Sequence, residues 1–78
     1  MSKWTSLSDD DKEYLHQRRQ FFKGLIEECK EKNLNEWISI NESVSNHIKS
    51  ILVRGGYYQE DVDTLNTLEI SASKQLSH

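Results

Sequence analysis

Apolar residues recur at helical spacing in the first half of the chain. Steps of seven, four and three residues separate Leu15, Phe22, Ile26 and Cys29. Ser8 precedes this segment and can accept a hydrogen bond from the first helical turn, while Asp11 stands three residues later as in a capping box. We therefore predict a first helix over about residues 9–32.

Two further helices follow from the same kind of pattern. Asn33 can cap a second helix, because Glu36 stands three residues later. The adjacent glycines Gly55–Gly56 can adopt the left-handed conformation that closes a helix. We expect the second helix over residues 35–54 and the third over residues 59–76, where apolar residues again recur at steps of three and four.

These elements predict a small all-α fold of three helices in up-down-up order. The 78 residues suffice for a single domain, 1–78, and the absence of proline permits long uninterrupted helices. Residues 1–7 are mostly polar, with Trp4 and Leu7 among them, and are predicted to form a short disordered N-terminal tail. A chain of this length buries only about 60% of its unfolded surface, so its core is thin and a large enclosed active-site cavity is not expected.

Charge and residue type exclude several classes of function. The net charge is −3, and the acidic excess lies in residues 33–78, so neither half carries the basic stripe of a nucleic-acid-binding domain. Cys29 is the single cysteine, which excludes an internal disulfide and points to a reducing compartment, the cytoplasm. No set of His and Cys residues has zinc-ligand spacing, and no nucleophile or phosphate-loop motif occurs. We expect no enzyme activity, no metal and no cofactor.

Arg18, in a small basic cluster on the first helix, has two possible interpretations. Arg18 falls between Leu15 and Phe22, where the helical stripe should be apolar. Its guanidinium can contact an acidic group, either on a partner or on the third helix, or its stem can pack while the charged end reaches water. Arg18, Arg19 and Lys23 form this cluster, which is also the basis of an alternative hypothesis, a nucleic-acid-associated regulator.

The aromatic residues point to a protein-interaction surface. Phe21 and Phe22 are adjacent and therefore project about 100° apart on a helix, so both cannot face the centre of a thin core. The broad apolar stripes of the first two helices either enclose the third helix or form an exposed patch for another protein. For the second case we predict these partner-contacting residues: Phe21, Phe22, Trp37, Tyr57 and Tyr58, with Arg18 and Arg19 at the polar rim.

The segment from Phe21 to Glu42 resembles the first helical hairpin of the flagellar export chaperones that serve the filament-cap protein. In that family a helix ends in a short polar turn, a large apolar residue opens the next helix, and an apolar pair and an acidic residue follow. Leu34 would open the helix here, Trp37–Ile38 would be the pair, and Ile40 and Glu42 follow. The resemblance covers about residues 15–52 and implies a cytoplasmic chaperone of a helical client.

The sequence as a whole predicts a small cytoplasmic helical module that binds another protein through an apolar and aromatic helix face. An adaptor, an inhibitor and a chaperone all fit this description, and the partner's identity stays open. A homodimer is the first form to test, because association would enlarge the small core. Membrane binding is not expected, because no apolar run approaches the roughly 20 residues of a membrane span.

Overall fold

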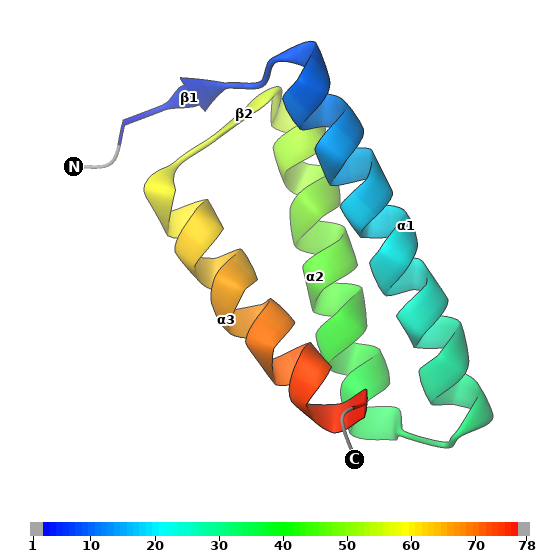
Figure 1. Ribbon diagram of the computed structural model, residues 1–78. Helices are drawn as coiled ribbons and strands as arrows, with labels where there is room; N and C mark the ends of the chain where they lie inside the picture. The colour runs from blue at the N-terminus through cyan, green and yellow to red at the C-terminus, as the bar shows by residue number, and fades with distance from the viewer. Residues whose placement is uncertain (1–2, 77–78) are drawn as a thin grey trace.

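Three antiparallel helices make up most of the protein. The computed structural model describes residues 3–76. Helix α1 spans Asp9–Glu31, α2 spans Asn35–Arg54 and α3 spans Gln59–Leu76. In Figure 1 they run down, up and down, so α1 and α3 are parallel to each other and antiparallel to α2. The predicted all-α three-helix bundle is confirmed, and the three predicted ranges agree with the observed bounds to within one residue.

The start of α1 follows directly from its local sequence. The Ser8 hydroxyl accepts a hydrogen bond from the backbone N–H of Asp11 at 3.1 Å, and the Asp11 carboxylate accepts from the Ser8 N–H at 3.2 Å. This reciprocal pair is a capping box. Asp9 and Asp10 add negative charge in the same first turn, where the helix dipole stabilises it. The helix then continues without a break through Gly24.

The turn between α1 and α2 differs from the prediction in one respect. Asn33 was expected to cap α2, but the residue at the N-cap is Leu34, which makes no side-chain capping bond. Asn33 instead adopts a left-handed backbone conformation with φ of 59°, and the N–H of Leu34 donates to the carbonyl of Cys29 at 2.9 Å. The predicted role is therefore wrong: Asn33 helps to end α1, because asparagine tolerates the left-handed conformation that such a turn requires.

A two-stranded sheet ties the N-terminal segment to the connection between α2 and α3. Strand β1 (Thr5–Ser6) pairs antiparallel with β2 (Gly56–Tyr57), and Thr5 lies opposite Tyr57. A Cβ atom added at Gly56 would overlap the Trp4 ring and lie 2.7 Å from the Thr5 carbonyl oxygen, so this pairing requires glycine. The prediction of a disordered tail is wrong for its described part, residues 3–7; residues 1–2 lie outside the described residues.

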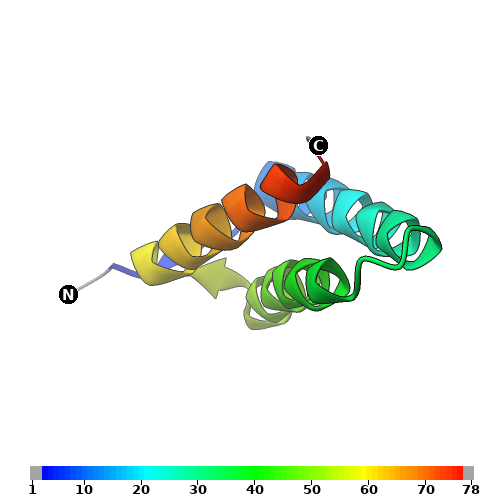
Figure 2. The same cartoon turned by 90° about the horizontal axis from the view of Figure 1, so that it is seen from below.

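The core lies where α2 packs against both other helices. Its fully buried members come from all three helices and form one cluster: Phe22, Val44, Ile48 and Ala72. Figure 2 shows α2 on one side of the molecule, with α1 and α3 on the other. Because α2 makes most of the helix–helix contacts, the space between α1 and α3 stays open on the side away from α2. Among residues 3–76, no helix is long and apolar enough to cross a membrane.

Candidate partner-binding surface

An apolar groove lies between α1 and α3, and α2 forms its floor. Its free volume is about 210 Å³. The lining is mostly apolar and comes from all three helices and the adjacent strand, with these apolar members besides Leu7: Tyr14, Leu15, Ile48, Ile51, Tyr57, Val62 and Leu65. Leu7, just before α1, also lines the groove. The groove exists because each outer helix directs its apolar stripe mainly toward α2.

An ion pair crosses this groove. Arg18 Nη2 on α1 lies 2.9 Å from Glu69 Oε1 on α3, and the two side chains are 33% and 26% exposed. The Arg18 guanidinium carbon also lies 5.3 Å from the Phe21 ring centroid and 5.1 Å from that of Phe22, within cation–π range. Of the two interpretations of Arg18, the structure supports contact with an acidic residue of the third helix, which is Glu69.

Large apolar side chains border the groove on both outer helices and remain open to solvent. Tyr14 and Phe21 on α1 are 54% and 52% exposed, and Ile70 on α3 is 59% exposed. Tyr14, Arg18 and Phe21 are separated by four and three residues and so share one side of α1. The groove together with Tyr14, Phe21 and Ile70 is called the α1/α3 face below. Apolar residues grouped around a groove are typical of an interaction surface.

The structure divides the predicted contact residues among different environments. Phe21, Arg18 and Tyr57 belong to the α1/α3 face. Phe22 was predicted as a partner contact, and this is wrong for the folded chain, because its side chain is 1% exposed at the centre of the core. Phe22 lies on the side of α1 that faces α2, and Phe21 projects about 100° away from it toward solvent.

The remaining predicted contacts lie away from this face or on its border. Trp37 is half-buried beside the turn between α1 and α2, whereas Tyr58 packs edge-on against Trp4 with ring centroids 5.0 Å apart. Arg19 is half-buried, and its Nε atom lacks a hydrogen-bond partner. Sequence reasoning missed Tyr14, Glu69 and Ile70 as members of the face. For Tyr14 a signal existed, because it precedes Arg18 by one helical turn.

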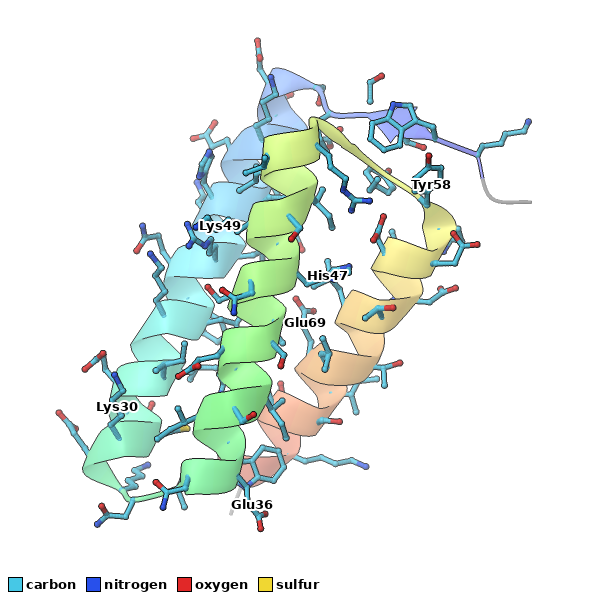
Figure 3. The ribbon with its side chains drawn as sticks, turned by 180° about the vertical axis from the view of Figure 1, so that it is seen from behind. Lys30, Glu36, His47, Lys49, Tyr58 and Glu69 are labelled. Atoms are coloured by element: carbon cyan, nitrogen blue, oxygen red, sulfur yellow. The ribbon has the colours of Figure 1, made fainter. Side chains whose placement is uncertain are left out.

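A second charged cluster joins α2 to α3. The Asp61 carboxylate is buried and accepts a hydrogen bond from the Tyr58 N–H at 2.8 Å. Arg54 Nη2 lies 3.0 Å from Asp61 Oδ2, and His47 Nε2 lies 3.1 Å from Asp61 Oδ1 without aligning as a hydrogen bond. Figure 3 shows His47 extending from α2 toward α3.

The contacts of Asp61 determine its protonation. Burial alone would raise the pKa of Asp61, but the Tyr58 N–H and the charges of Arg54 and His47 together outweigh burial and lower it. The carboxylate is therefore ionised over the neutral range. It caps α3 and anchors that helix to α2, and this structural role accounts for all of its contacts.

The single cysteine of the chain, Cys29, lies in the core. Cys29 is fully buried and receives a long contact from Asn41 Nδ2 at 3.6 Å, so its thiol is inaccessible in the folded chain. Among residues 3–76, no group of three His, Cys, Asp or Glu side chains is placed to hold a metal ion. The α1/α3 face is thus the feature with the clearest capacity for binding.

Comparison with protein-family models, with curated proteins and with solved structures finds no match to this chain.

Proposed function

We propose that the protein is a small protein-interaction module that binds a helical partner protein on its α1/α3 face. The observation that supports this function is the open apolar groove between two parallel helices, which exposed Tyr14 lines. Exposed Phe21 lies beside Arg18 of the groove, and exposed Ile70 lines the adjoining hollow that shares Arg18 and Glu69 with it. Exposed large apolar side chains are costly in water, and a partner that covers them recovers about 25 cal/mol per Å² of apolar area. A patch of this kind around a groove favours protein binding.

Helix packing in a groove is the mechanism that this shape favours. A partner helix can lie along the groove with apolar anchors at steps of three, four and seven residues. Tyr14, Phe21 and Ile70 would contact those anchors, since aromatic and large apolar residues contribute most of the binding energy at interfaces. Arg18 and Glu69 neutralise each other, so the polar part of the groove does not leave a buried unpaired charge when a partner covers it.

The same contacts weigh against the nucleic-acid alternative. Binding to phosphate requires cations that are free to release counterions. The Arg18 charge is engaged by Glu69 and Arg19 is half-buried, so Lys23 is the one member of the predicted basic cluster that is fully exposed, which is too little for a cationic stripe. We place the module in the cytoplasm, because its free buried thiol suits a reducing compartment. A chaperone form of the module is in line with the resemblance of residues 15–52 to flagellar export chaperones.

The test is affinity capture from cells that normally make the protein, with three forms as bait. Wild-type protein is compared with the F21E/I70E variant, which places charge on both borders of the groove. V53E is the matched control, because Val53 is also apolar and 78% exposed but lies on α2. The proposal predicts a protein, identified by mass spectrometry, that wild type and V53E recover and F21E/I70E does not. Equal recovery by all three forms contradicts the proposed site, and so does recovery of no protein.

A further inference from the structure

We infer that the partner helix on the α1/α3 face is basic at one end, and that this end lies over the first turns of α1 and α3. The inference rests on the proposed function, because it uses the same face and specifies the chemistry of the helix that covers it. It follows from three carboxylates around the groove, from the balanced charge at the opposite end and from the size of the groove.

Three exposed aspartates surround the groove where α1 and α3 begin. Asp11 lines the groove itself. Asp10 precedes Tyr14 by four residues, so it extends the exposed border of α1 by one turn. Asp63 precedes Ile70 by seven residues and therefore lies on the same side of α3. Because α1 and α3 run in the same direction, the three carboxylates lie at the same end of the face.

The chain itself does not neutralise the charge of these aspartates. Within the part of the chain that the structure describes, none of the three forms an ion pair. Arg18, the cation of the groove, is paired with Glu69. Lys12 precedes Arg18 by six residues and projects about 120° away from it, on the side of α1 that faces away from α3. Lys3 precedes β1, whose partner is β2 and not an outer helix.

The direction of Asp10 separates a binding role from helix capping. Asp9 and Asp10 both lie in the first turn of α1, where negative charge interacts favourably with the helix dipole. They project about 100° apart, and Asp10 is the one that shares the side of Tyr14. Interaction with the dipole is therefore common to both aspartates, whereas contact with a helix on the α1/α3 face is open to Asp10 alone.

The opposite end of the face has no such excess of one sign. Carboxylates and cations are equal in number in the last two turns of α1, the residue after it and the end of α3: Glu27, Glu28 and Glu31 against Lys30, Lys32 and Lys74. Lys32 lies 3.0 Å from Glu28, and Lys30 lies 3.6 Å from Glu27. Glu36 opens α2 and points away from the bundle in Figure 3. A covering helix therefore meets an attraction for cations at one end only.

This distribution of charge favours a different, basic chain over a second copy. A second copy in parallel orientation would place its aspartates against aspartates, which repel each other. A reversed copy would place its aspartates against the balanced end and would gain no pairing there. A helix with lysine or arginine at one end and an apolar stripe along the rest matches both parts of the face.

The size of the groove indicates how that helix is anchored. An apolar cavity of about 150 Å³ holds a benzene ring, so the free volume of about 210 Å³ accepts one large side chain. A helix is about 10 Å across, so its backbone lies above the groove and a single anchor enters it. Arg18 and Glu69 neutralise each other beside that anchor. The charge of the partner thus belongs over the aspartates and not at the anchor.

Designed helical peptides that differ in one end test the inference. All share a stripe of leucine around one phenylalanine at steps of three and four residues, and the end carries a run of lysine, glutamine or glutamate. Fluorescence anisotropy measures their binding to the full chain at an ionic strength of about 0.1 M, where charges more than about 10 Å apart are largely screened. We expect the lysine peptide to bind about tenfold more tightly than the glutamine peptide, and the glutamate peptide to bind most weakly.

Aspartate variants locate the source of this preference. D10N should remove part of the preference for lysine over glutamine, and D10N/D63N should remove most of it. D9N is the matched control, because it takes the same charge from the same helical turn on another side of α1, and it should leave the preference unchanged. Circular dichroism confirms that each variant remains helical.

Equal binding of the lysine and glutamine peptides would overturn the inference, and so would a preference that survives D10N/D63N. If the peptides bind regardless of their charge and F21E/I70E abolishes binding, the inference fails and the proposed function stands. Sedimentation of the chain alone at twice its 9.2 kDa, lost in F21E/I70E, would show a second copy on the face and would also overturn the inference. No binding of any peptide contradicts both.

Discussion

Arg18 Nη2 on α1 lies 2.9 Å from Glu69 Oε1 on α3, and this ion pair connects two helices that otherwise meet mainly through α2. The same guanidinium rests on the rings of Phe21 and Phe22, so one side chain contacts the core, the exposed border and the far side of the groove. Arg18 thus spans the groove next to the exposed ring of Phe21.

Replacing Glu69 and replacing Arg18 should lower the free energy of unfolding by different amounts. E69Q removes a partly exposed ion pair and should lower the free energy of unfolding by about 0.5 kcal/mol. R18A also removes the packing of the stem and the cation–π contacts, and should cost about 1.5 kcal/mol. Urea denaturation of both variants measures the difference. Equal losses would mean that the contacts of Arg18 with the two rings contribute nothing to stability.

The adjacent phenylalanines should differ strongly in their contribution to stability. F22A opens a cavity in the core and should lower the free energy of unfolding by about 3–5 kcal/mol. F21A removes a half-exposed ring and should cost less than about 1 kcal/mol. Urea denaturation at low protein concentration compares the two. A large loss for F21A and a small one for F22A would reverse the assignment of core and surface on α1.

Asp61 should make stability depend on pH in the acidic range. Its pKa is lowered in the folded chain, so the unfolded chain binds a proton at higher pH than the folded chain does. Its stabilising contribution is present above the unfolded pKa of about 3.9 and is lost as pH falls through the folded pKa. D61N should cost about 1–3 kcal/mol at neutral pH and should flatten this decline.

The matched control for Asp61 is D63N. Asp63 is exposed on the same helix, and its carboxylate accepts a hydrogen bond from the Gln59 side chain. Thermal unfolding measured from neutral to acidic pH should therefore show a flattened profile for D61N and an almost unchanged profile for D63N. The same acid profile for wild type and D61N would show that Asp61 does not set the pH dependence.

Two glycines should respond in opposite ways to the same added methyl group. G56A forces a Cβ against the Trp4 ring and the Thr5 backbone, so it should displace β1 and expose Trp4 to solvent. G24A meets open space in a helix and should stabilise the chain by about 1 kcal/mol. Acrylamide quenching of Trp4 fluorescence, measured in a W37F background, follows the effect of G56A. Thermal unfolding follows the effect of G24A. Unchanged quenching in G56A would contradict the packing of Trp4 over Gly56.

Local signals explain why the helix bounds could be predicted from the sequence. The Ser8–Asp11 capping box and the left-handed Gly55 act within a few residues, so they can be recognised without knowing the fold. Asn33 shows the limit of such signals, because asparagine suits both the start of a helix and the left-handed residue after one. Which of these two roles Asn33 takes depends on the backbone conformation of the whole turn between α1 and α2.

Features that depend on distant residues could not be predicted in the same way. β1 and β2 have only two residues each and pair across some fifty positions, so their sequences carry no periodic signal. The spacing of Phe21 and Phe22 shows that the rings diverge, but only the position of α2 decides which ring is buried. The bridge from Asp61 to Arg54 and His47 depends on how α3 folds back on α2.

Photocrosslinking in cells that normally make the protein tests the role of the α1/α3 face most directly. A benzophenone side chain replaces Phe21 or Ile70 on that face, or Val53 on α2 as the control position with a still more exposed side chain. We predict discrete adducts with a protein, either another chain or a second copy, from positions 21 and 70 and few or none from position 53. Adducts from position 53 alone, or none from positions 21 and 70, would contradict the assignment of this face as the binding surface.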